Sequence, residues 1–218
     1  SRPSMGRALE YFYTASEQCV PGGPHFSYSY YIGVAGIVSS VAMLCATFLY
    51  THTLSGMRYR RVFIVTTLLR CLAGCSDFWI VKRWNVAMGI SDSVAYLLGE
   101  AIFEPVVGML GYIPAVALIS KIVSPGMESS VYAFMAGTYN FGSLTASLGG
   151  ELIYETAGVV TSGEQQCDFS GLATLVMICH VALPTVFTLG FVWLIPDALQ
   201  TESLLKEEKE GDGIAKFE

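Results

Sequence analysis

Five long stretches of mostly apolar residues, separated by short polar connections, form the main pattern along this chain. A helix needs about 20 such residues to cross a hydrocarbon core of about 30 Å, and a helix satisfies its own backbone hydrogen bonds there. Soluble core helices this long and this uncharged rarely follow one another. We therefore predict an all-α, polytopic membrane helix bundle with five transmembrane helices, at about residues 30–50, 62–81, 94–119, 131–153 and 171–195.

The basic residues are distributed unevenly between the two sets of connections, and this predicts the orientation. Cytoplasmic loops of membrane proteins are enriched in Lys and Arg. The 51–61 and 120–130 loops and the C-terminal tail carry seven basic residues and the other side carries four, while the 154–170 loop has none. The seven are Arg58, Arg60, Arg61, Lys121, Lys206, Lys209 and Lys216. We place these seven in the cytoplasm, which puts the first residues outside.

The two ends of the chain differ from the apolar stretches. Residues Arg7 to Thr14 resemble the last turns of a helix whose apolar beginning is missing. We predict that the chain is a fragment, in which residues 1–29 hold the end of a truncated helix plus an outer loop. Residues 196–218 are rich in charge and poor in apolar side chains, so they cannot form a core of their own. We predict a solvated cytoplasmic tail there.

Composition and motifs exclude two large classes of function. Charged residues make up 14% of the chain and the formal net charge is -6, so no basic stripe is available to displace counterions from nucleic acid. Nucleic acid is therefore not a predicted partner. The sequence has no nucleophile elbow, no zinc-protease motif and no phosphate-binding loop. We predict that the chain is not an enzyme and has no cofactor.

The six cysteines fall into two groups. Four lie within predicted spans, where thiols behave as small apolar groups, and no His or third thiol lies near Cys71 and Cys75 to complete a metal site. Cys19 and Cys167 lie instead in polar segments on the predicted outer side, where oxidation is allowed. We predict a disulfide between these two; the alternative is that both remain free thiols.

Four of the ionisable residues inside predicted spans are candidates for function, because insertion of each costs at least about 2.5 kcal/mol. Arg70 and Asp77 are seven residues apart on one helix face, and Glu100 and Glu104 are four apart on another. The first two could be structural ion-pair partners of neighbouring helices or could bind substrate. Two carboxylates so close in a low dielectric cannot both stay ionised cheaply, so proton coupling is a hypothesis for the second pair.

Other polar and helix-bending residues in the spans have two interpretations. Asn140 lies among small residues, where it could join helices or reach a ligand. Pro105 and Pro114 each remove a helix hydrogen bond, so the third span is predicted to bend. His180 is interpreted as a satisfied core residue, with a kink at Pro184 four residues later.

Several ordered motifs point to a family. They are Phe-Tyr-Thr at 12–14, Asp77 six residues before Arg-Trp-Asn at 83–85, Gly-Ile-Ser-Asp at 89–92, Ile-Pro-Ala-Val at 113–116, Ser-Pro-Gly-Met-Glu-Ser at 124–129, and Asn140 with Gly142. Residues 58–150 thereby resemble the folate-biopterin transporters of the major facilitator superfamily. Ser91 and Ser124 depart from the family pattern, and Arg70 has no counterpart in it.

The resemblance implies a twelve-helix carrier made of two six-helix halves, of which this chain matches the second. It implies transport of a pteridine or folate, with the missing N-terminal half and the lipid bilayer as partners, protons as a candidate coupling ion, and the plasma membrane as the location. The alternative is a non-transporting or degenerate membrane protein that packs with a partner through the small residues of the fourth span.

The implied substrate suggests roles for individual residues. A pterin presents two parallel donors that a carboxylate can accept, and the glutamate of folate needs a cation. The candidate substrate-binding residues are Arg70, Asp77, Glu100, Glu104 and Asn140. The candidate gating or structural residues are Arg83, Asn85 and Asp92 at the outer rim and Lys121 and Glu128 at the inner rim.

Overall fold

The computed structural model describes residues 6–123, 126–156, 159 and 167–201, and these residues are helical wherever they are regular. This part of the chain contains no β-strand, and an isolated β-bridge pairs Arg58 with Leu199. The α-helices are α1 (Gly6–Thr14), α2 (Ala35–Thr53), α3 (Tyr59–Val81), α4 (Trp84–Ala87), α5 (Asp92–Tyr96), α6 (Glu104–Ile122), α7 (Glu128–Thr156), α8 (Leu172–Val176) and α9 (Leu183–Phe191). The all-α class predicted from the apolar pattern is thus confirmed.

Three π-helical segments and one 3-10 turn continue these helices. They are η1 (Ser29–Val34) before α2, η2 (Leu97–Phe103) between α5 and α6, η3 (Met177–Ala182) between α8 and α9, and η4 (Val192–Leu194) after α9. The resulting continuous helices are long and apolar enough to cross a membrane at Ser29–Thr53, Tyr59–Val81, Asp92–Lys121 and Leu172–Leu194. Four of the five predicted spans therefore correspond to candidate membrane helices in the described residues.

The remaining predicted span, residues 131–153, lies in α7. This helix is long enough to cross a bilayer, but its Gly, Ser, Thr and Asn residues make it less apolar than the other four, and it is not among the candidate spans. Its large side chains are mostly exposed, among them Phe134, Tyr139 and Phe141. That α7 crosses the membrane stays a prediction.

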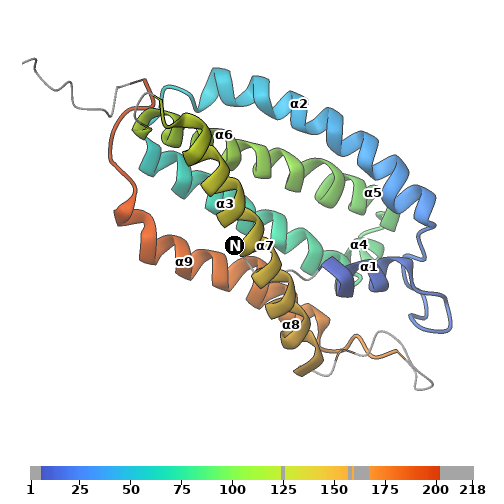
Figure 1. Ribbon diagram of the computed structural model, residues 1–218. Helices are drawn as coiled ribbons and strands as arrows, with labels where there is room; N and C mark the ends of the chain where they lie inside the picture. The colour runs from blue at the N-terminus through green and yellow to red at the C-terminus, as the bar shows by residue number, and fades with distance from the viewer. Residues whose placement is uncertain (1–5, 124–125, 157–158, 160–166, 202–218) are drawn as a thin grey trace, which may run out of the picture.

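The candidate spans pack in a defined order (Figure 1). Helix α6 lies between α2 and α3, and α3 also packs against η3 and α9. The larger apolar core lies at the end that carries α1, around Phe12, Ile80 and Val176. A smaller core around Tyr50 and Val62 holds the opposite end. The two ends of the bundle are therefore held by very different amounts of buried apolar surface.

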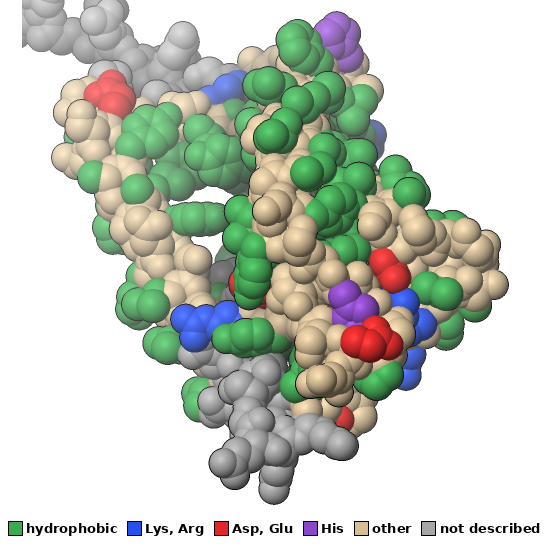
Figure 2. All heavy atoms as spheres, turned by 90° about the vertical axis from the view of Figure 1, so that its right-hand side faces the viewer, with side chains coloured by type: hydrophobic (Ala, Val, Ile, Leu, Met, Phe, Trp, Pro, Cys, Tyr) green, Lys and Arg blue, Asp and Glu red, His purple; other side chains and the backbone are tan. Residues whose placement is uncertain are grey.

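Apolar side chains also cover the outside of the bundle. Ile37, Leu44 and Phe48 on α2 are each more than 65% exposed. Seen from the end that carries α1 and α5, hydrophobic side chains occupy much of the visible surface and charged side chains gather in small groups (Figure 2). Such a surface is suited to lipid rather than water, because soluble proteins rarely expose large contiguous apolar patches.

Cys19 and Cys167 are joined by a disulfide, with 5.2 Å between their Cα atoms. The bond connects the loop after α1 to the segment before α8, across 148 residues of sequence. The other four cysteines form no disulfide with the described residues. The covalent link thus fixes α1 to the start of the last span.

The beginning of the C-terminal tail is packed rather than solvated, which corrects the prediction for this segment. Gln200 is only 8% exposed. Its side-chain amide donates to the carbonyl oxygens of Leu54, at 2.6 Å, and Met57, at 3.1 Å. The backbone carbonyl of Gln200 accepts a hydrogen bond from Lys121. The correction has a simple physical reason, because the carbonyls at the end of α2 need donors. Residues 202–218 lie outside the described residues.

We expect Cys19→Ser to lower the free energy of unfolding by about 2–4 kcal/mol, because the unfolded chain loses a long-range constraint. Thermal unfolding of the purified protein in detergent measures the change. Cys45→Ser, at an exposed free thiol, is the control and should change the stability by less than about 0.5 kcal/mol. Equal effects of the two substitutions, or thiols at positions 19 and 167 that are alkylated without reduction, would contradict the prediction.

Candidate functional site

A buried polar cluster around Asp77 lies where three segments of the chain meet. Asp77 on α3 is 1% exposed. Its Oδ2 lies 2.8 Å from Nδ1 of His180 on η3, and its Oδ1 accepts a hydrogen bond of 3.4 Å from the hydroxyl of Tyr13 on α1. Both carboxylate oxygens therefore have partners, which is what burial of an ionisable group in a low dielectric requires.

Gly74, one turn before Asp77, allows η3 to approach closely enough for this pairing. A Cβ atom at Gly74 would lie 2.7 Å from the Cβ of His180 and 3.0 Å from its carbonyl oxygen. Real side chains do not tolerate such distances, so only glycine fits unless the backbone of η3 moves. The backbone contact at Gly74 thus sets the distance between the Asp77 and His180 side chains.

Aromatic rings enclose the Tyr13 side of the cluster. The ring of Tyr13 packs edge-on against Tyr96 at a centroid distance of 5.1 Å and stacks on Phe26 at 6.0 Å. Tyr31 stacks on Tyr96 at 5.5 Å. Burial, followed by the charges of Asp77 and Glu100, raises the pKa of the Tyr13 phenol well above its ordinary value. Tyr13 therefore stays protonated and keeps donating to Asp77 across the physiological pH range.

The two π-helical segments η2 and η3 follow from the prolines that come after them. Pro105 and Pro184 have no N–H, and in an α-helix their rings would clash with the carbonyls four residues earlier, at Ala101 and His180. Both of these carbonyls lie inside a π-helical segment. A widened turn relieves the clash, and π-helical turns are common at functional sites. The prolines thereby account for the irregular backbone at His180 and Glu100.

Glu100 and Glu104 are both half-buried, on η2 and at the start of α6. The helix face that Glu104 shares with Gly108 and Gly111 points toward α3. A Cβ at Gly108 would lie 3.6 Å from Nη2 of Arg70, and one at Gly111 would touch Thr66. Arg70 makes no hydrogen bond or ion pair with the residues that the structure describes. The predicted structural ion pair between Arg70 and a neighbouring helix is therefore not formed within this part of the chain.

The structure separates the remaining substrate-binding candidates. Asn140 is exposed on α7 and makes no hydrogen bond to the described residues. Arg70 and Asp77, predicted to share a helix face, have different neighbours: Arg70 lies against α6, and Asp77 lies against η3 and α1. A joint substrate site made of these five residues therefore stays a prediction.

The predicted outer-rim residues form one compact turn between α3 and α5. Arg83 has a left-handed backbone, with φ of 58°, and its guanidinium donates two hydrogen bonds to Asp92, at 2.6 and 2.9 Å. The amide of Asn85, which is fully buried, donates to Asp92 at 2.7 Å and to the carbonyl of Ile90 at 3.2 Å. One carboxylate thus fixes the whole turn.

The two predicted inner-rim residues have different partners. Lys121 at the end of α6 donates to the carbonyl of Gln200, while a carboxylate oxygen of Glu128 accepts from the backbone N–H of Gly126 at 2.9 Å. Hydrogen bonds from its own backbone and that of Gly126 lower the pKa of Glu128. Glu128 therefore holds the start of α7, and Lys121 holds the C-terminal segment.

Sequence reasoning missed three residues that complete these sites. In the sequence Tyr13 stands out only as part of a motif, His180 has no evident partner, and Gln200 belongs to the predicted solvated tail. The one signal for His180 was its position four residues before Pro184. Nothing in the sequence pattern pointed to Gln200, because it lies beyond the last apolar stretch.

Comparison with known proteins identifies the family that this arrangement belongs to. The model of the BT1 family matches residues 3–213. The chain belongs to the BT1 family. Proteins similar to this BT1 family chain include Probable folate-biopterin transporter 6 of Arabidopsis thaliana, which is 27% identical over 85% of this chain and 35% of the relative. No solved structure is significantly similar to the chain.

Two further relatives come from distant organisms. Folate-biopterin transporter of Synechocystis sp. is 28% identical over 84% of this chain and 36% of its own length. Folate transporter 2 of Plasmodium falciparum is 25% identical over 82% of this chain and 37% of its own. All three relatives are named as transporters, in agreement with the prediction that the chain is not an enzyme. The chain spans little more than a third of their length.

We expect Asp92→Ala to destabilise the protein by about 2–3 kcal/mol, because it leaves the Arg83 guanidinium and the buried Asn85 amide without their acceptor. Thermal unfolding in detergent measures the loss. The matched control is Asp197→Ala, which breaks a pair with Arg58 whose side chains are about half exposed and should cost less than about 1 kcal/mol. If Asp197→Ala proves as damaging as Asp92→Ala, the structural role of the turn is refuted.

Proposed function

We propose that this chain is the C-terminal half of a carrier that moves pteridines or folates across the plasma membrane, built as the second six-helix half of a major-facilitator-type transporter. The proposal is supported by the family, by the transporter names of the relatives and by four candidate membrane helices. The missing partner is then an N-terminal half, because the substrate cavity of such carriers lies between the halves.

The observation that carries the proposal is the buried Asp77 cluster. Ionisable groups inside membrane spans are expensive and are retained where they serve transport or proton relay. Asp77 and His180 are almost fully buried in two different candidate spans, and half-buried Glu100 lies close enough to act on the same tyrosine. A purely structural bundle could replace such groups with apolar side chains at no loss of stability.

Glu100 is the carboxylate that we assign to the two donors of a pterin ring. In this conformation the two oxygens of Asp77 contact Tyr13 and His180. Glu100 is half-buried on a π-helical turn, less deeply than Asp77. Binding at Asp77 would first require Tyr13 or His180 to leave. We therefore place Asp77 in the coupling machinery, with Glu104 as a proton acceptor.

Arg70 is the cation that we assign to the glutamate portion of a folate. It is half-buried in the second candidate span and has no anionic partner among the described residues. A guanidinium in this setting binds a carboxylate through two parallel hydrogen bonds. We assign Asn140 on α7 to the substrate cavity as a second polar contact. This contact forms when the other half of the carrier covers α7.

Uptake of radiolabelled folate and biopterin tests the proposal, using the complete open reading frame that encodes these residues in a host that lacks folate uptake. We expect Asp77→Asn and Glu100→Gln each to lower the initial rate about tenfold or more, a loss of about 1.4 kcal/mol. The protein should still reach the membrane, as judged by surface labelling.

Asp197→Asn provides the matched control, because it removes a carboxylate whose side chain is about half exposed. Its uptake should stay within about twofold of the wild-type rate. Wild-type protein that reaches the membrane but transports neither compound contradicts the proposed function. Normal uptake by Glu100→Gln refutes only the assignment of that residue. A proton-coupled carrier should also show faster wild-type uptake as the outer pH falls.

A further inference from the structure

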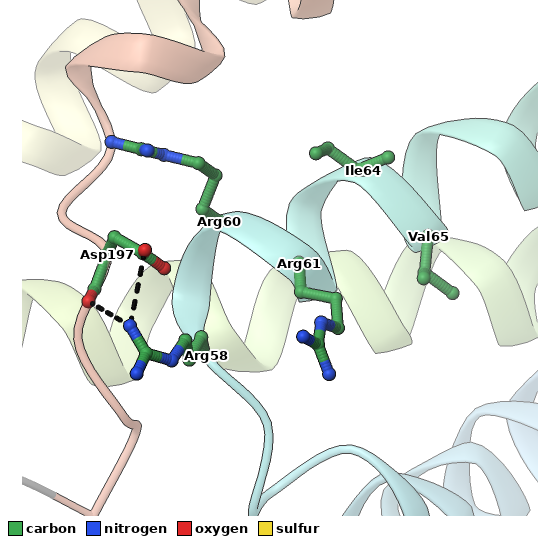
Figure 3. Close-up of a pocket in the computed structure, with 6 residues that line it drawn as sticks. All are labelled: Arg58, Arg60, Arg61, Ile64, Val65 and Asp197. Atoms are coloured by element: carbon green, nitrogen blue, oxygen red, sulfur yellow. Dashed lines mark hydrogen bonds and ion pairs between the residues drawn. The ribbon is translucent and has the colours of Figure 1, made fainter.

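Three arginines line a pocket where α3 begins and the last span ends (Figure 3). The pocket has a volume of about 460 Å³ and is lined by Arg58, Arg60, Arg61, Ile64, Val65 and Asp197. Asp197 is the one acidic residue in this lining, so the pocket carries an excess of positive charge. Excess positive charge in a hollow selects an anion.

The three guanidinium groups are not equally engaged. Arg58 pairs with the Asp197 carboxylate at 3.2 Å, and Arg60 donates to the carbonyl of Ile195 at 3.0 Å and lies over the ring of Trp193. Arg61 makes no hydrogen bond or ion pair with the described part of the chain, and its side chain points away from Asp197 (Figure 3). Arg61 is therefore the group with the most capacity to bind an added anion.

An apolar groove adjoins the arginine pocket. The groove has a volume of about 490 Å³ and is lined by Phe63, Thr67, Phe187, Thr188, Phe191, Val192 and Ile195. It runs between α3 and α9, and Ile195, which lines it, is also the residue whose carbonyl accepts from Arg60. A cationic pocket thus opens beside an apolar groove of similar size.

The arginine pocket and the apolar groove lie at the level of the bundle expected for a membrane interface. Both lie at the ends of candidate spans, Tyr59–Val81 and Leu172–Leu194. Trp193 is 74% exposed beside Arg60, and Trp with Arg is typical of the headgroup level. The basic residues assign this end to the cytoplasm, where the leaflet contains anionic lipids.

We propose that this site binds an anionic phospholipid from the cytoplasmic leaflet. The headgroup phosphate lies in the arginine pocket, held by Arg61, and one acyl chain follows the groove between α3 and α9. Guanidinium groups bind phosphate oxygens through paired, charge-assisted hydrogen bonds, and the groove excludes water from the chain. The site is separate from the Asp77 cluster, and it does not depend on the proposed transport function.

Lipid retention by the purified chain tests this site. The protein in nonionic detergent is incubated with phosphatidylglycerol or with phosphatidylcholine of the same acyl chains, and the bound lipid is counted by native mass spectrometry. We expect wild-type protein to retain about fivefold more phosphatidylglycerol, the factor that one basic residue supplies near an anionic surface. Equal retention of the two lipids overturns the proposal.

Substitutions at matched basic positions locate the binding. Arg61→Gln should reduce retention of phosphatidylglycerol to the level of phosphatidylcholine, and Arg61→Lys should restore at least half of the preference. Lys82→Gln, which removes one charge from an exposed position at the other end of α3, should change nothing. Equal losses at positions 61 and 82, or no recovery with lysine, refute the assignment to this pocket.

Soluble competitors distinguish a lipid from phosphate alone. Inorganic phosphate and glycerophosphoglycerol, which has the headgroup but no acyl chains, should fail to displace the bound phosphatidylglycerol at millimolar concentration. Displacement by either compound shows that the groove contributes nothing, and the proposal of a lipid site is then wrong.

Discussion

The buried carboxylate of Asp77 is the constraint on which the arrangement of this bundle depends. A carboxylate with 1% exposure inside a membrane helix must have partners, because transfer of an unpaired charge to a low dielectric costs several kcal/mol. The partners come from α1 and η3, far away in sequence. Their approach requires Gly74 on α3 and is secured by the disulfide that ties the α1 loop to the segment before α8. Covalent, steric and electrostatic features thus converge on one end of the bundle.

The irregular backbone of η2 and η3 follows from two prolines and coincides with polar groups. Pro105 and Pro184 each follow a π-helical segment, and these segments carry Glu100 and His180. Within a bilayer, non-helical backbone is tolerated only where protein or a cavity satisfies it. Segments η2 and η3 therefore depart from regular α-helical geometry at Glu100 and His180, and each contributes buried residues to the interior of the bundle.

The sequence sufficed for features that depend on one segment at a time. Long apolar runs located four candidate spans, because the bilayer thickness sets their length. The position of Cys19 and Cys167 in polar segments, where oxidation is allowed, singled out these two of the six cysteines as a disulfide pair. The sequence could not predict side-chain contacts between distant segments, because the pairing of Asp77 with His180 depends on a close contact of two helices at a glycine. Gln200 was missed for the same reason: an isolated glutamine after the last apolar stretch shows no periodicity, and only the fold reveals the carbonyls that it satisfies.

The two ends of the bundle differ in how firmly they are closed. At the α1 end, a large apolar and aromatic core, a disulfide and the Arg83–Asp92 turn hold the helices together. At the other end a small apolar core is supplemented by hydrogen bonds to Gln200. Polar contacts exchange with water at little net cost, whereas apolar burial does not. Separation of the helices therefore requires less free energy at the end with Gln200, and motion of the bundle is expected to start there.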